Sequence, residues 1–252
     1  MASHFVRWMY NPERLPGTLT LPQEVVDSAP QYTDKRRGCF LATRLILAEL
    51  LRRVYGIAIL PTLTTAANGR PCFIDPDMPD FSISYAGNLV GVLLAEENNR
   101  AGLDMEIVRA HSRQAQENLL QGLSSGEKAW INEQQDFMEA VTQIWTLRQS
   151  VIKLTGDIGC DDEDALRLHP AYGRLRSVHY SDIQAICNTE PTLVWSCALS
   201  PATERLRLWE IDGYDQWKAL RDMELKKPNM GPRALRLTSL PGERVMSQAA
   251  GY

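Results

Sequence analysis

Two acidic side chains, Asp104 and Glu106, stand one residue apart after a long apolar stretch. The apolar run 89–95 and a polar turn precede them, so we expect residues up to 106 to form a further strand. Side chains alternate between the faces of a strand, which would put both carboxylates on one face with Cα atoms about 7 Å apart. Like charges this close are tolerated mainly with a cation between them, and Mg²⁺ favours carboxylate oxygens while keeping waters and substrate phosphates. The pair is therefore a candidate magnesium site, with a solvated strand end as the alternative.

A second group of polar side chains lies on a predicted helix over 137–154. Gln149 and Lys153 are four residues apart, so they share one helix face, and Trp145 lies one turn earlier on that face. Arg148 is adjacent, about 100° round the helix. An ordinary helix with a buried indole would show the same pattern, and we assign Trp145 to the core.

The helices and strands predicted to position these residues occur in two similar groups along the chain. A helix is predicted over 34–55, with Asp34 as its N-cap and Gly56 as its end. Ser124 and Glu127 have capping-box spacing before the next helix, and Gly156 ends the long one. Strands are expected in both groups, at 81–85, 89–95, 175–180, 183–187, 193–199 and 206–211.

Each group contains a helix followed by strands, which predicts an α+β fold of two similar halves. We expect an N-terminal half over 1–108, a C-terminal half over 109–225 and a mobile tail over 226–252. The tail carries Pro, Gly, Arg and Ser with little hydrophobic periodicity.

The amino-acid composition excludes several classes of protein. The chain has 252 residues, 44% of them hydrophobic, with a net charge of −4, which argues against a general nucleic-acid binder. No apolar run has the length of a signal peptide or a membrane span. The 5 cysteines are odd in number and lack Cys-x-x-Cys spacing, and the 4 histidines are scattered, so we expect reduced thiols and no zinc site. A monomeric cytoplasmic protein without nucleic-acid or membrane partners is predicted.

Several segments, taken in order, resemble a known family. They are Arg37-x-x-Phe-Leu-Ala-x-Arg44, Gly-Arg-Pro at 69–71, Phe-Ser-Ile-Ser-Tyr-Ala-Gly at 81–87, Gly-Leu-Asp-Met-Glu at 102–106 and Trp-Thr-Leu-Arg-Gln-Ser-Val-Ile-Lys at 145–153. Together they resemble the 4′-phosphopantetheinyl transferases of the Sfp type, and the likeness extends from about residue 35 to 199.

The resemblance implies two pseudo-two-fold-related halves with coenzyme A in the cleft between them. It also implies Mg²⁺-dependent transfer of the phosphopantetheine arm to a serine of an acyl or peptidyl carrier protein. The residues at the family's catalytic positions are Asp104, Glu106, Gln149 and Lys153, the first two as metal ligands. The residues at its coenzyme-binding positions are Arg37, Arg44, Arg70, Pro71, Ser84, Tyr85, Arg148 and Lys153.

The chain departs from the family pattern at two positions that matter for chemistry. Gln149 replaces an acid, and an amide cannot accept a proton at pH 7. Tyr85 replaces a histidine, and Arg70 and Arg148 replace lysines. A slow transferase, with metal-bound water or Glu127 as base, is our main prediction. A binder of coenzyme A or a carrier protein without transfer is the first alternative. An unrelated metal enzyme, such as a nucleotide-sugar transferase, is the second, although no Gly-rich phosphate loop is present.

Overall fold

The computed structural model describes residues 1–11, 13, 21–67, 69–156, 166–177, 183–200, 203–212, 216–225 and 233–236. The fold is α+β, as predicted. The chain divides into two compact units, which we describe separately. Unit 1 comprises Met1–Leu103 and Leu199–Lys227, and unit 2 comprises Asp104–Ala198 and Pro228–Tyr252.

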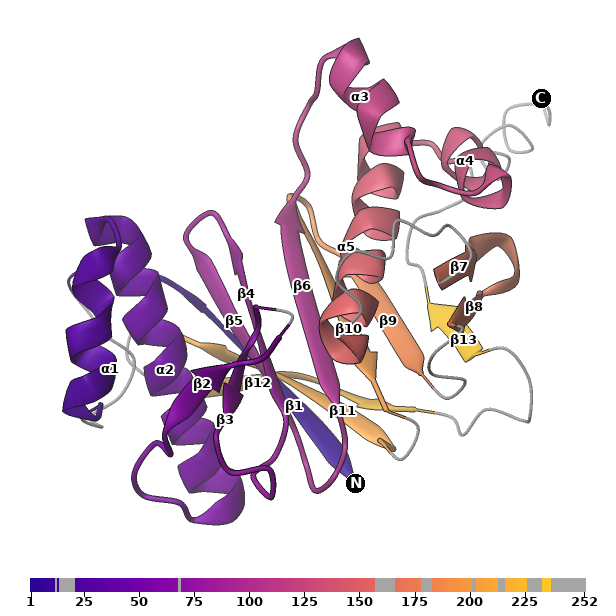
Figure 1. Ribbon diagram of the computed structural model, residues 1–252. Helices are drawn as coiled ribbons and strands as arrows, with labels where there is room; N and C mark the ends of the chain where they lie inside the picture. Colours follow the sequence, from indigo (N-terminus) through magenta and orange to yellow (C-terminus); the bar gives the residue numbers. More distant parts are fainter. Residues whose placement is uncertain are drawn as a thin grey trace. The chain divides into compact units, whose positions relative to one another are not determined.

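Unit 1 is built on a five-stranded sheet in the order β12-β11-β1-β5-β4. The central strand β1 pairs in parallel with β11 and antiparallel with β5. Helices α1 and α2 lie together on one face of this sheet, and β2 pairs with β3 as a separate two-stranded ribbon (Figure 1). The elements are β1 (Ala2–Met9), α1 (Gln23–Ser28), a 3₁₀ turn (Ala29–Gln31), α2 (Asp34–Tyr55), β2 (Leu63–Thr65), β3 (Pro71–Phe73), β4 (Phe81–Ala86), β5 (Leu89–Ala95), β11 (Arg205–Ile211) and β12 (Trp217–Glu224).

Helix α2 has the bounds that the sequence predicts, and Gly56 ends it in a left-handed conformation with φ 72°. The N-cap is Thr33 rather than Asp34, which occupies the first helical position instead. A Cβ at Gly38 would lie 1.8 Å from the hydroxyl of Tyr10, so a larger residue at this position of the helix would force the Tyr10 ring to move. Residues of α2 and the sheet form the core of unit 1, including Ile46, Leu47, Leu50, Leu51, Phe81, Val92 and Leu94.

Unit 2 contains a six-stranded sheet in the order β6-β10-β9-β13-β8-β7. Helix α5 packs against β9, and its buried side chains recur at helical spacing. The elements are β6 (Ala101–Ile107), α3 (Arg113–Leu120), α4 (Ser125–Asn132), α5 (Phe137–Thr155), β7 (Leu166–His169), a 3₁₀ turn (Pro170–Tyr172), β8 (Arg174–Ser177), β9 (Gln184–Thr189), β10 (Leu193–Leu199) and β13 (Arg233–Arg236).

Two local predictions for unit 2 are confirmed and one is wrong. Ser124 and Glu127 form both hydrogen bonds of a capping box at α4, and Gly156 ends α5 in the left-handed conformation. Trp145, which we assigned to the core, is 42% exposed. The buried stripe of α5 runs through Ile144, Leu147, Val151 and Leu154, so Trp145 is turned about 100° away from it.

The division of the chain differs from the predicted one. The boundary falls inside β6, after Leu103, and β11 and β12 belong to unit 1 because β11 pairs in parallel with β1. The segment 226–252, expected to be a mobile tail, contains β13, which pairs with β8 and β9. The rest of that segment, Cys160 and the end of the strand predicted over 175–180 lie outside the described residues. The pseudo-two-fold relation and the cleft between the halves stay predictions.

Among the described residues, no helix is both long and apolar enough to cross a membrane.

Candidate functional site

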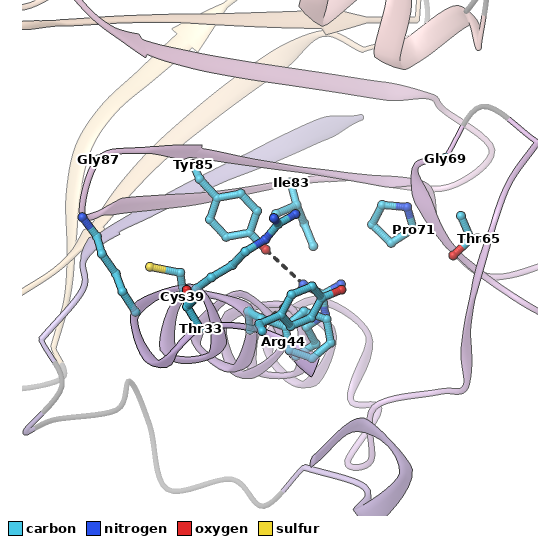
Figure 2. Close-up of a pocket in the computed structure, with 13 residues that line it drawn as sticks. Thr33, Cys39, Arg44, Thr65, Gly69, Pro71, Ile83, Tyr85 and Gly87 are labelled. Carbon is cyan, nitrogen blue, oxygen red and sulfur yellow. Dashed lines mark hydrogen bonds between the residues drawn. The ribbon is translucent and has the colours of Figure 1, made fainter. Parts of the chain in front are cut away.

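Unit 1 contains a pocket of about 600 Å³ beside the first turns of α2. Side chains from α2 form one wall, residues of β2 and β3 form another, and Ile83 and Tyr85 of β4 face the pocket from the sheet (Figure 2). Ile83 and Tyr85 are two residues apart, so they lie on the same face of β4. The pocket therefore lies between the helix, the ribbon and the edge strand of the sheet.

The described residues that line this pocket include three cations and no carboxylate. The cations are Lys35, Arg36 and Arg44, all from α2. Arg36, Phe40 and Arg44 follow one another at intervals of four residues, so they form one stripe on the helix. Lys35 and Arg36 were not predicted as site residues, although the four-residue spacing could have identified Arg36. An anionic ligand fits such a lining better than a neutral or cationic one.

Arg44 is the most deeply buried of these cations, at 8% exposure. Its Nη1 atom donates to the Tyr85 hydroxyl at 3.1 Å and to Thr43 Oγ1 at 3.0 Å, and Figure 2 shows the contact with Tyr85. Its guanidinium carbon lies 3.7 Å from the centroid of the Phe40 ring. Among the described residues no carboxylate forms an ion pair with Arg44, and its buried Nε makes no hydrogen bond. Burying an unpaired cation costs free energy, which an anion in the pocket would offset.

The predicted coenzyme-binding residues of unit 1 fall into two groups. Arg44, Pro71 and Tyr85 line the pocket, whereas Arg37, Arg70 and Ser84 do not. Because side chains alternate along β4, the buried Ser84 lies on the opposite face from Tyr85.

The two arginines outside the pocket have carboxylate partners. Arg37 is exposed and pairs with Asp34 at 3.0 Å. Arg70 pairs with Asp80 and donates to the Phe81 carbonyl at 2.7 Å. Burial raises the pKa of Asp80, and the charge of Arg70 partly offsets this effect.

The acid pair lies on β6, with both residues in unit 2. Asp104 is buried at 6% exposure, and Lys153 Nζ of α5 donates to its Oδ1 at 2.7 Å. Glu106 is more exposed; partial burial and then the charge of Asp104 raise its pKa. The two carboxylates repel each other, and a divalent cation bound between them would offset this repulsion.

The carboxylates of β6 suit a magnesium ion, which keeps water or phosphate ligands, better than a metal that is coordinated entirely by protein side chains. Among the described residues, no group of three or more His, Cys, Asp or Glu side chains is placed to hold a metal. Two carboxylates alone leave coordination positions for waters and phosphate oxygens, which is the usual arrangement for Mg²⁺. Asp104 and Glu106 would hold the ion.

Replacing Glu106 with Gln should raise the thermal midpoint of the metal-free protein by roughly 1–2 °C at pH 7, because it removes a repelled charge. The gain should vanish below about pH 4, since a raised native pKa means that the wild-type carboxyl is already protonated there. Differential scanning fluorimetry with and without MgCl₂ measures both effects, and the variant should also lose any magnesium-induced shift. Glu117→Gln on α3, an exposed carboxylate, is the control. An unchanged magnesium response in Glu106→Gln contradicts the metal site.

Gln149 lies one turn before Lys153 on α5 and is partly exposed. Among the described residues, its side-chain amide has no hydrogen-bond partner, although its backbone lies within the helix. The structure therefore places an amide, without a structural role of its own, on the helix face that carries Lys153.

Arg148, a predicted coenzyme-binding residue, forms a buried ion pair with Glu127. Arg148 Nη1 donates to Glu127 Oε1 at 2.9 Å and to the Leu166 carbonyl at 3.0 Å. Glu127 is fully buried, and its other oxygen accepts the Ser124 N–H at 2.8 Å. The suggestion that Glu127 accepts the serine proton is therefore wrong, because both of its oxygens are committed and solvent does not reach it.

We expect Glu127→Gln to lower the free energy of unfolding by about 3 kcal/mol, because it leaves Arg148 without its charged partner in a buried position. Urea denaturation followed by circular dichroism measures this loss. Glu139→Gln is the matched control: Glu139 also occupies the third position of a capped helix, but burial raises its pKa, so losing its charge should cost little. Equal effects of the two substitutions would contradict the assignment.

Comparison with known proteins finds relatives that match over nearly the whole chain. The uncharacterized protein YieE of Escherichia coli (strain K12) is 42% identical over 251 residues, which are 98% of this chain and 99% of that protein. The chain belongs to the YieE family.

More distant relatives match this YieE-family protein over part of its length. A putative 4′-phosphopantetheinyl transferase of Haemophilus influenzae is 30% identical over 57% of this chain and 62% of that protein. The 4′-phosphopantetheinyl transferase AcpT of Salmonella typhimurium is 26% identical over 54% of this chain and 67% of that protein. These partial matches support membership of the 4′-phosphopantetheinyl transferase superfamily. No family model matches the chain.

Proposed function

We propose that this protein is a magnesium-dependent 4′-phosphopantetheinyl transferase of the Sfp type with an atypical active site. The observation that carries the proposal is the buried Arg44 guanidinium in a pocket whose lining, as far as the structure describes it, contains three cations and no carboxylate. Coenzyme A supplies the matching anion, since it carries a phosphate monoester on its ribose as well as a diphosphate. The names of the distant relatives support the same reaction class.

In this proposal the pocket of unit 1 binds the nucleotide part of coenzyme A. Arg44 binds the phosphate monoester, and Lys35 and Arg36 add positive charge at the pocket edge. Tyr85, where the family has histidine, offers a neutral hydroxyl that already accepts a hydrogen bond from Arg44. Arg70 and Arg148 are assigned structural roles instead, because both are held in ion pairs.

The chemical step needs charge neutralisation and a place for one proton. The carrier serine oxygen bonds to the phosphorus next to pantetheine, and the bond from that phosphorus to adenosine 3′,5′-bisphosphate breaks. Bound to Asp104 and Glu106, Mg²⁺ would supply charge neutralisation for the diphosphate. Lys153 provides a further positive charge beside Asp104. Gln149 cannot accept the serine proton, which would pass to water instead, so we expect a low rate of transfer.

Intact-protein mass spectrometry tests the proposal. The pure protein is mixed with an apo-acyl carrier protein or an apo-peptidyl carrier protein, coenzyme A and MgCl₂. We expect the carrier to gain the mass of one phosphopantetheine arm, and to gain none when EDTA replaces MgCl₂ or when the carrier serine is replaced by alanine. No transfer to any carrier, together with coenzyme A binding, would favour the second candidate, a binder without transfer. Gln149 is the observation that favours this candidate.

A further inference from the structure

Arg44 is held in place by neighbours that have no charge of their own. Thr43 is fully buried, and its Oγ1 donates to the Phe40 carbonyl at 2.9 Å while it accepts from Arg44 Nη1 at 3.0 Å. The same oxygen lies 3.2 Å from the Tyr85 hydroxyl. One hydroxyl thus connects the guanidinium, the helix backbone and the strand side chain.

Aromatic rings fix the other side of the guanidinium. The Phe40 ring lies under Arg44, and the Tyr32 ring contacts Phe40 with centroids 5.1 Å apart. Arg36 in turn lies over Tyr32, with its guanidinium carbon 5.0 Å from the ring centroid. The rings and the two cations are thereby held together in the pocket by cation–π contacts.

This arrangement preorganises a cation that would otherwise rotate freely. An arginine side chain loses much rotamer entropy on binding a ligand, and a guanidinium fixed beforehand avoids that loss. Arg44 Nη1 is fully engaged by Tyr85, Thr43 and Phe40, while the buried Nε makes no hydrogen bond. Among the described residues, all hydrogen bonds that hold this guanidinium go to Nη1, so the fixed orientation leaves Nη2 for a ligand.

We propose that Thr43 is a positioning residue that orients Arg44 to bind the phosphate monoester of the coenzyme, and so sets the preference for coenzyme A over its dephosphorylated form. The inference rests on the proposed function, since it takes coenzyme A as the ligand. Thr43 need not touch the coenzyme, because it acts through Arg44.

The test compares two ligands that differ only in the 3′-phosphate, coenzyme A and dephospho-coenzyme A. Thr43→Val keeps the side-chain volume and removes the hydroxyl. By isothermal titration calorimetry we expect it to weaken coenzyme A binding about tenfold, the size of one or two hydrogen bonds, and to change dephospho-coenzyme A binding less than about twofold. Thr43→Ser should restore the preference because it restores the hydroxyl. In the transfer assay, KM for coenzyme A should rise in Thr43→Val while kcat stays the same.

The control is Thr142→Val on α5, where the hydroxyl donates only to the Met138 carbonyl, at 2.6 Å, and no arginine is involved. It should leave the affinities for both ligands unchanged. If Thr43→Val lowers the affinity for both ligands equally, Thr43 has a purely structural role. If it lowers neither affinity, Thr43 has no role in binding. Either result overturns the inference, while transfer by the wild type would still support the proposed function. If the wild type binds neither ligand and transfers nothing, the proposed function fails and this inference fails with it.

Discussion

Replacing Arg44 with Met should weaken coenzyme A binding by roughly 100-fold, or about 3 kcal/mol, without lowering the thermal midpoint of the protein. The methionine stem keeps the contact with Phe40, while the cation that would bind the phosphate is gone. Stability should hold because the substitution removes a buried charge that has no anionic partner among the described residues. Calorimetric titration and a thermal melt on the same samples measure the two effects.

Arg37→Met is the matched control for this experiment. Arg37 is on the same helix, but it is 46% exposed by its side chain, pairs with Asp34 and does not line the pocket. We expect less than a twofold change in affinity for this variant. Similar losses in the two variants would mean that the net charge of α2, and not the pocket, attracts the coenzyme. A stable Arg44→Met protein that still binds coenzyme A at full affinity would show that the pocket is not the site.

Gln149→Glu should accelerate phosphopantetheine transfer by about 10²-fold, because it restores a group that can accept the serine proton. The new carboxylate would lie on the α5 face of Lys153, which contacts Asp104, so it should also strengthen magnesium binding. Initial rates of carrier modification at several MgCl₂ concentrations separate the two contributions. The kcat should rise even at saturating magnesium.

Gln114→Glu, the same substitution at an exposed position of α3, controls for the change in net charge. An unchanged rate in Gln149→Glu would mean that the missing acid does not limit transfer. If the wild type shows no activity and Gln149→Glu gains it, the protein is a binder whose catalytic acid has been lost, and the second candidate function is supported.

Several helices and strands of this protein could be predicted from its sequence because the residues that specify them lie close together along the chain. Helix α2 was predicted from its apolar periodicity and from Gly56, which ends it in the left-handed conformation. The start of α4 was predicted from the capping-box spacing of Ser124 and Glu127. Strands β5 and β10 have the predicted bounds. Strand β1 was missed, although it lies at the centre of the unit 1 sheet. Its polar residues alternate with apolar ones only in part, and its partners come from distant parts of the chain.

The sequence by itself determined the chemistry that is available: the acid pair of β6, the basic start of α2, and an amide where the resembling family has an acid. Only the tertiary structure decided which arginines are free to bind a ligand. Arg70 and Arg148 are engaged by Asp80 and Glu127, which are 10 and 21 residues away along the chain. Within the described part of the chain, Arg44 contacts hydroxyls, a carbonyl and an aromatic ring but no carboxylate. Motif matching assigned all three to the coenzyme because it compares residue types. An ion pair depends on the distance between two side chains in space, and spacing along the chain does not fix that distance.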